Sequence, residues 1–193
     1  MKALFLAPIA AIALMAATVS NVYNVDTTAS KVKWRGEKVT GFHEGGIAVK
    51  NGTLTYADGK LTGGSFEIDM NSITCTDLDA ETGGKLVGHL KSADFFGADK
   101  YATSKYVITK AIPIDSKGNY KIIGNLTIKE TTKEVKFNAF VMEKDGKIAA
   151  NGKITIDRSE YDVRFGSGAF FENLGDKTIY DEFILDVTLA AKK

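Results

Sequence analysis

Residues 86–96 read LVGHLKSADFF, and their pattern differs from the sequence on both sides. From residue 77 to 92, apolar side chains recur at helical spacings, with Asp77 as an acid for the first turn. The pattern breaks at residues 92–94, and Phe95-Phe96 follow in a turn. We therefore expect one short amphipathic helix near 77–92. Such a helix needs an apolar surface, so it is either a packing plug or a gate at the mouth of a barrel.

The sequence around this helix predicts β-strands. Short runs of alternating apolar and polar residues are separated by glycine-rich turns, and Asp58-Gly59 and Asp145-Gly146 are strong hairpin signals. About eight substantial strands favour an all-β fold with a closed, antiparallel eight-stranded barrel, although a sandwich stays open. The predicted strands are 22–25, 31–39, 47–56, 61–70, 105–115, 120–129, 134–143, 148–157 and 178–190, with a bend at 41–46, a turn at 130–132 and an irregular segment at 158–176.

Length and charge indicate the general class of the protein. The chain has 193 residues, which suits a single β domain. Lys plus Arg number 25 and Asp plus Glu number 24, so the net charge is only +1. This balance lacks the basic footprint of a nucleic-acid-binding protein.

The first residues resemble a targeting segment. Met1-Lys2 provides a positive start, residues 3–19 carry no charge, and small residues surround Ser20. We predict a signal peptide at 1–20 and a mature domain at 21–193, periplasmic or secreted, with no stable membrane insertion after cleavage. A retained membrane anchor is the alternative, for which the run is short.

Residues that often carry chemistry are few. Cys75 is the only cysteine, so no internal disulfide forms. His43 and His89 are the only histidines, and neither lies in a recognisable metal-binding spacing. No nucleophile elbow or phosphate loop is present. We therefore predict no cofactor, no metal and no enzymatic activity.

Two arginines in the irregular segment suggest a polar site. The guanidinium groups of Arg158 and Arg164 suit bidentate contacts with a phosphate or pyrophosphate head group. Salt bridges to Glu160 or Asp162 are the simpler explanation of their position.

Several strands have one face that is apolar but thinned by small residues. Gly124, Ala139, Ala150 and Gly152 fall among the larger apolar residues of these strands. An interior built in this way leaves room for a small ligand in an eight-stranded barrel, or aromatic side chains fill the space.

Five motifs resemble the YceI-like family: GFHEG at 41–45, GGSFEIDMNSI at 63–73, GHLKSADFF at 88–96, GNLTIK at 124–129 and IDRS at 156–159. The third is the most specific, and together they span most of the mature chain. The resemblance implies an exported bacterial protein with a lipocalin-like barrel, some members of which bind a polyisoprenoid lipid inside. The function expected is therefore to hold a polyisoprenoid or similar amphiphilic lipid for transport or storage.

Two other functions stay open, namely a metal-dependent or hydrolytic enzyme in the same barrel and a stress-linked structural protein. The expected partner is a small lipid ligand, and a homodimer is left open. His43, His89, Arg158 and Arg164 are candidates for contact with a head group. The candidate ligand-binding residues are Trp34, Phe66, Ile68, Leu86, Leu90, Phe95, Phe96, Leu126, Phe137, Val141, Phe183 and Leu185.

Overall fold

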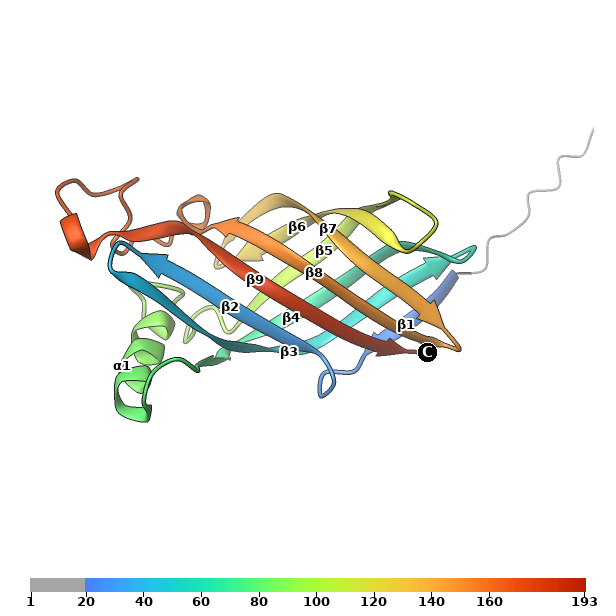
Figure 1. The fold of residues 1–193 in the computed structure, drawn as a ribbon, viewed down its shortest axis with the longest axis horizontal. Helices are drawn as coiled ribbons and strands as arrows, with labels where there is room; N and C mark the ends of the chain where they lie inside the picture. Colours follow the sequence, from blue (N-terminus) through green and yellow to red (C-terminus); the bar gives the residue numbers. More distant parts are fainter. Residues whose placement is uncertain (1–19) are drawn as a thin grey trace, which may run out of the picture.

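The structure, a computed structural model, describes residues 20–193 as an antiparallel sheet that closes on itself (Figure 1). The predicted signal peptide therefore lies outside the described residues, apart from Ser20. One helix, α1 (Ala80–Lys91), and two short 3-10 helices, Arg158–Tyr161 and Gly175–Lys177, lie at one end of the sheet. The strands are β1 (Ser20–Val25), β2 (Lys31–Lys38), β3 (Gly41–Ala57), β4 (Lys60–Cys75), β5 (Thr103–Pro113), β6 (Asn119–Ile128), β7 (Thr131–Lys144), β8 (Lys147–Asp157) and β9 (Ile179–Lys192).

Nine strands form an eight-stranded barrel because β1 and β2 occupy one position. Both run antiparallel to β3, with Asn24 opposite Thr53 and Val32 opposite Ile47, and both also pair with β9. They are one strand interrupted between Val25 and Lys31. Since β3 also pairs with β4, the sheet closes, and the predicted antiparallel eight-stranded barrel is confirmed.

The Asp-Gly hairpins form as predicted. Asp58 and Gly59 have φ values of 52° and 72°, and Asp145 and Gly146 have values of 52° and 74°. Positive φ at both central residues is the mark of a type I′ turn, whose twist matches that of the flanking strands. The predicted turn at 130–132 is one residue too late, since β7 already begins at Thr131.

The predicted bend at residues 41–46 is wrong, because this segment begins the long strand β3. Its glycines serve a close approach instead. A Cβ at Gly45 would lie 1.8 Å from the carbonyl oxygen of Thr74 and 2.8 Å from the Trp34 indole nitrogen. That nitrogen donates a hydrogen bond to the Thr74 carbonyl at 3.0 Å. Glycine is thus required for the Trp34 side chain to lie across β3.

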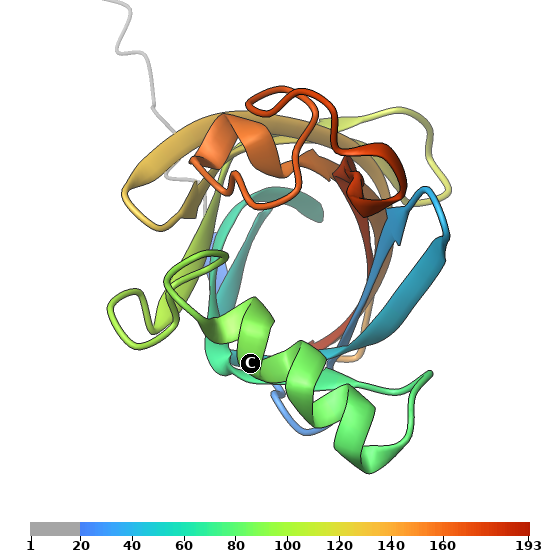
Figure 2. The ribbon, with the colours of Figure 1, turned by 90° about the vertical axis from the view of Figure 1, so that its left-hand side faces the viewer.

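Strand β4 is longer than predicted, and helix α1 starts later. The strand continues past Met70 to Cys75, and a break in the β3–β4 register accommodates the extra residues. Asp79 caps the helix by accepting hydrogen bonds from the N–H groups of Glu81 and Thr82, both at 2.9 Å. Asp77 therefore lies before the helix and is not its first-turn acid. Figure 2 shows α1 crossing one side of the barrel end.

Within residues 20–193, no helix combines the length and the apolar character needed to cross a bilayer.

Candidate functional site

The inward faces of the strands enclose an apolar cavity of about 230 Å³. Every strand from β2 to β9 contributes to its wall, as do Leu90 of α1 and the Phe95-Phe96 pair after the helix. The volume lies below the usual range of about 300–1,000 Å³ for small-molecule pockets. A ligand with a long chain therefore has to displace side chains or project from the cavity.

The few polar side chains at this wall are already engaged within the protein. The Ser104 hydroxyl lies 3.1 Å from the Met70 sulfur, and the Tyr106 hydroxyl donates to the Val135 carbonyl at 3.1 Å. The cavity thus offers its occupant apolar contact and little hydrogen bonding. Such a site selects a hydrocarbon chain rather than a polar substrate.

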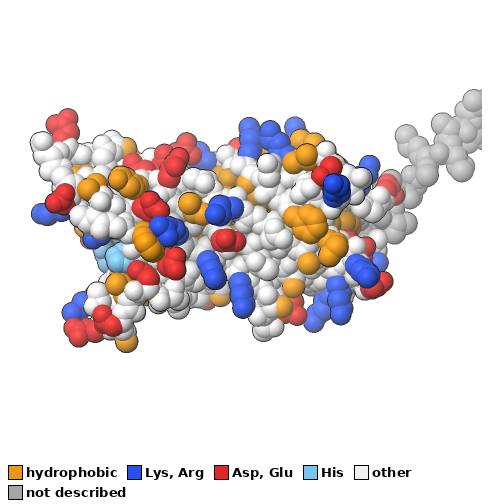
Figure 3. Space-filling model, in the orientation of Figure 1, with side chains coloured by type: hydrophobic (Ala, Val, Ile, Leu, Met, Phe, Trp, Pro, Cys, Tyr) orange, Lys and Arg blue, Asp and Glu red, His pale blue; other side chains and the backbone are white. Residues whose placement is uncertain are grey.

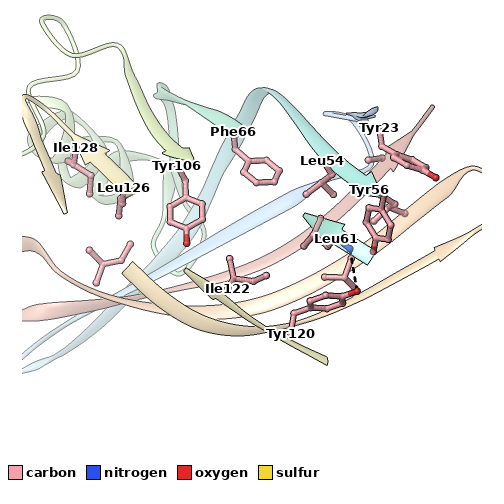
Figure 4. Close-up of a cluster of buried hydrophobic side chains, with 14 of the residues drawn as sticks. Tyr23, Leu54, Tyr56, Leu61, Phe66, Tyr106, Tyr120, Ile122, Leu126 and Ile128 are labelled. Carbon is pink, nitrogen blue, oxygen red and sulfur yellow. Dashed lines mark hydrogen bonds between the residues drawn. The ribbon is translucent and has the colours of Figure 1, made fainter. Parts of the chain in front are cut away.

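Tyrosines close the end of the barrel that lies away from α1 (Figure 4). The rings of Tyr23 and Tyr56 meet edge-on with centroids 5.6 Å apart, and both residues are buried. Tyr120 accepts a hydrogen bond from the Leu61 N–H at 3.4 Å. Burial raises the pKa of Tyr56, so its hydroxyl stays neutral at ordinary pH. These tyrosines pack in one buried cluster with Leu54 and Leu61, which line the cavity.

Helix α1 and the segment after it lie over the opposite end. Leu90 and Phe96 pack with the buried cluster of Met70, Ile73 and Ala98. The helix approaches β4 closely at Gly83, where an added Cβ would lie 3.5 Å from the Cys75 Cβ. The predicted apolar surface under the helix is therefore the rim of the barrel.

A chain of aromatic rings leads from the surface into the cavity. Phe165, which is 44% exposed, meets His89 edge-on at 4.3 Å between centroids. His89 contacts Phe95 at 5.8 Å, Phe95 contacts Phe96 at 5.1 Å, and Phe96 contacts Phe183 on the cavity wall at 6.3 Å. The first contact joins α1 to the segment between β8 and β9. Because Phe95 and Phe96 also line the cavity, this seam lies where the cavity wall meets the surface, and we call it the mouth of the cavity.

Arg158 is buried and holds this mouth together. Its side chain donates to the carbonyls of Val163, Phe165, Ile179 and Tyr180 at 2.8–3.3 Å. It also pairs with Asp181 at 3.1 Å, rather than with Glu160 or Asp162 as the simpler sequence interpretation had it. Burial lowers the pKa of Arg158, against the opposing effect of nearby carboxylates. These contacts leave the guanidinium little capacity for a head group.

The other arginine of that segment is exposed. Arg164 pairs with Asp162, as the sequence suggested, and its guanidinium carbon lies 4.9 Å from the centroid of the Phe170 ring.

His43 belongs to a second polar cluster at the start of the α1 segment. Its Nδ1 lies 2.9 Å from Asp77, whose other oxygen accepts from the Glu44 N–H at 2.9 Å and from the Cys75 thiol at 3.2 Å. Burial alone would raise the pKa of Asp77, but these hydrogen bonds outweigh it and hold the pKa at about 2. Among residues 20–193, no three His, Cys, Asp or Glu side chains are grouped to hold a metal.

The structure brings almost all the predicted ligand-binding residues to one cavity. Leu86 is the exception, since it is half-buried on α1 and does not reach the wall. Arg158 lines the wall, whereas His43, His89 and Arg164 do not. The residues that form the wall as predicted are Trp34, Phe66, Ile68, Leu90, Phe95, Phe96, Leu126, Phe137, Val141, Phe183 and Leu185.

Other residues of the cavity wall are not among the candidates that the sequence indicates. Ile154 and Ile156 continue the face of Gly152, and the simple alternation of β8 could have identified them. Val49 was hidden because register breaks on both sides of it disturb the alternation of β3. Gly124 does not widen the cavity, because the Tyr106 ring takes the place of its missing side chain, 2.5 Å from where a Cβ would lie.

A family model described as YceI-like domain matches residues 23–191. Among solved structures, BcnA of Burkholderia cenocepacia has a TM-score of 0.69 at 22% identity, over 87% of this chain and 99% of that one. A polyisoprenoid binding domain from Saccharophagus degradans, implicated in plant cell wall breakdown, has a TM-score of 0.67 at 13% identity, over 88% and 97%. The YCEI protein of Campylobacter jejuni has a TM-score of 0.54 at 22% identity, over 70% of this chain and 74% of that one. The TM-scores show a shared fold, and at identities this low they show the fold alone. No curated protein matches the sequence.

Proposed function

Because this chain belongs to the YceI-like domain family, we propose that it binds a polyisoprenoid or similar amphiphilic lipid inside its barrel. The observation that carries the proposal is the cavity, whose wall is apolar and reaches α1 and the segment after it at Leu90, Phe95 and Phe96. The Saccharophagus degradans domain of similar fold is described as binding polyisoprenoid, which adds support.

The cost of an empty cavity also favours a ligand. Cavities that truncation leaves in protein cores destabilise by about 24 cal/mol per Å³, so a dry void of 230 Å³ would cost about 5.5 kcal/mol. Net stabilities of domains are about 5–15 kcal/mol. A lipid chain that fills the space restores much of this loss, because it replaces missing contacts with apolar ones.

We further propose that the protein is a carrier or store and does no chemistry on its ligand. The polar groups of Ser104, Tyr106 and Arg158 at the cavity wall are engaged with protein atoms rather than directed at a bound molecule. Export to the periplasm belongs to the same proposal and rests on the uncharged run at residues 3–19.

Native mass spectrometry of freshly purified protein tests the binding function. We expect a non-covalent adduct with the mass of an isoprenoid lipid, which is lost after organic extraction and restored by incubation with that lipid. A metal adduct with no lipid, or a protein that never takes up an isoprenoid after extraction, would overturn the proposal. N-terminal sequencing of exported protein tests cleavage near Ser20.

A further inference from the structure

The exposed aromatic residues of the barrel gather at the end that carries the cavity mouth. Among the described residues, five aromatic side chains are exposed. Each of the five has between 41% and 49% of its surface exposed. We call these five the aromatic rim: Phe42, Phe165, Phe170, Phe171 and Tyr180. Phe42 belongs to the β2–β3 hairpin, and the others lie in or beside the segment between β8 and β9.

These two segments are neighbours at the mouth. The Val39 N–H donates to the Thr178 carbonyl at 3.2 Å, and Lys38 lies opposite Ile179 in the β2–β9 pairing. Tyr180 is both part of the rim and part of the cavity wall, and Phe165 starts the aromatic chain that leads inside. The rim is therefore continuous with the lining of the cavity.

The opposite end of the barrel is different. Its exposed apolar side chains, among them Ile112, Ile114 and Met142, are aliphatic or thioether groups, and none of these three lines the cavity. Figure 3 shows hydrophobic side chains among charged ones at both ends of the molecule. Only the rim end combines aromatic exposure with a route inward, among the residues described.

Hydrogen bonds to buried side chains fix the backbone of the loop that carries Phe165, Phe170 and Phe171. Ser167 is fully buried, its hydroxyl donates to Asp181 at 2.9 Å, and its carbonyl accepts the N–H groups of Phe170 and Phe171. Arg158 holds the carbonyl of Phe165 from the same side. The exposed rings are therefore presented by an anchored loop, and an apolar patch kept exposed in this way marks an interaction surface.

We propose that the aromatic rim docks on the surface of a lipid bilayer, so that the cavity mouth faces the membrane from which its ligand comes. Phe side chains insert at the boundary between headgroups and hydrocarbon in segments that lie on a membrane, and Tyr is enriched at that boundary. Cations at this end are accompanied by carboxylates. Arg35 pairs with Glu37 and Arg164 with Asp162, and the segment between β8 and β9 also carries Glu160, Glu172 and Asp176 beside Lys177. Docking is therefore driven by the rings and depends weakly on anionic lipid. This inference rests on the proposed function, since it supplies the route by which a lipid enters.

Sedimentation with vesicles tests the docking. Wild-type protein is expected to co-sediment with phosphatidylcholine vesicles and to gain little when phosphatidylglycerol is added. The double variant Phe170→Ser/Phe171→Ser should bind about tenfold more weakly, while Ile114→Ser/Met142→Ser, with similar exposure at the other end, should bind like wild type. Equal binding of both variants, or binding only to anionic vesicles, would overturn the proposal.

A crossed measurement separates this inference from the proposed function. The probe is farnesol added in solution, followed by quenching of Trp34 fluorescence. Phe170→Ser/Phe171→Ser should weaken vesicle binding by about tenfold and keep farnesol binding. Absence of farnesol binding in wild type, with vesicle binding intact, would count against the cavity function alone. Analytical ultracentrifugation then measures whether the wild-type protein and the rim variant are monomers or dimers. A wild-type dimer that the rim variant abolishes would assign the rim to a second copy of the chain and overturn docking.

Discussion

The imidazole ring of His89 on α1 meets the ring of Phe165 edge-on, with 4.3 Å between centroids and 86° between planes. The two residues come from the two segments that flank the cavity mouth, so their contact closes the seam through which a ligand chain would pass. A pair of this geometry contributes about 0.5–1.5 kcal/mol beyond burial. The Arg158 guanidinium also crosses the seam, 5.2 Å from the centroid of the Phe95 ring. Contacts of these kinds are weak enough for the seam to open without unfolding the barrel.

We predict that Phe165→Ala speeds ligand release several-fold and lowers the free energy of unfolding by no more than about 1.5 kcal/mol. Release of a fluorescent isoprenoid into a protein acceptor, with no membrane present, measures the rate. Ile114→Ala serves as the control, because this side chain is at least as exposed but lies at the closed end. An unchanged release rate in Phe165→Ala would place the exit elsewhere.

Leu90→Ala and Phe96→Ala separate a gate from a plug. Both side chains are partly buried against the cluster beneath α1, so each truncation should cost about 2–3 kcal/mol of stability. If α1 gates the cavity, at least one variant also releases lipid faster, since such changes act mainly on the off-rate. A melting curve and a release rate for each variant are the measurements. Loss of stability with unaltered release in both would reduce α1 to packing.

The fold could be predicted from the sequence because local signals and topology agreed. Asp58-Gly59 and Asp145-Gly146 specified their hairpins, and alternation in β6, β7 and β9 gave the inward faces on which Leu126, Phe137 and Phe183 lie. The errors lie where tertiary contacts decide. Gly45 reads as a turn residue, yet it is glycine because the Trp34 side chain crosses over it.

The polar residues of the site were the least predictable. Neither the Arg158 contacts with Asp181 and β9 nor the pairing of His43 with Asp77 joins residues that are near in sequence. Such partners depend on how the loops fold over the barrel end, and no local pattern encodes that. Helical spacing predicts the face on which Leu86 lies to within a turn but not the depth that the side chain reaches, so the expected contact of Leu86 with the cavity is absent.

Filling the cavity from within should abolish uptake without unfolding the protein. Leu126→Trp adds volume to a buried wall position that borders empty space, so we expect loss of farnesol binding with a melting temperature within a few degrees of wild type. The matched control is Asn125→Trp, whose side chain faces outward from the same strand. Normal uptake by a folded Leu126→Trp protein would show that the ligand occupies a different region.

Asp77 should make the attachment of the α1 segment sensitive to acid. Its folded pKa of about 2 lies below the ordinary value of 3.8, so its contribution to stability is fully present above about pH 4 and is lost as the pH falls through 2. Asp77→Asn should therefore be less stable than wild type by about 1–2 kcal/mol at pH 7, with a difference that vanishes near pH 2. Denaturant unfolding across this range measures it, with the exposed Asp94→Asn as control. A difference independent of pH would contradict the assignment.

Arg158 should act as a structural tie and not as a receptor for phosphate. Lysine keeps the charge but cannot reproduce the fork of bonds to four carbonyls and Asp181, so Arg158→Lys should lose about 3–5 kcal/mol of stability. Arg164→Lys, exposed on the same segment, should change stability by no more than about 0.5 kcal/mol. The ligand preference is a separate test of Arg158.

Because the side-chain donors of Arg158 are engaged with protein atoms, wild type should bind farnesyl diphosphate no more tightly than farnesol. Isothermal titration calorimetry with each compound measures the two affinities. A clear preference for the diphosphate that Arg158→Lys removes, measured at a temperature where the variant is folded, would restore Arg158 as a head-group site.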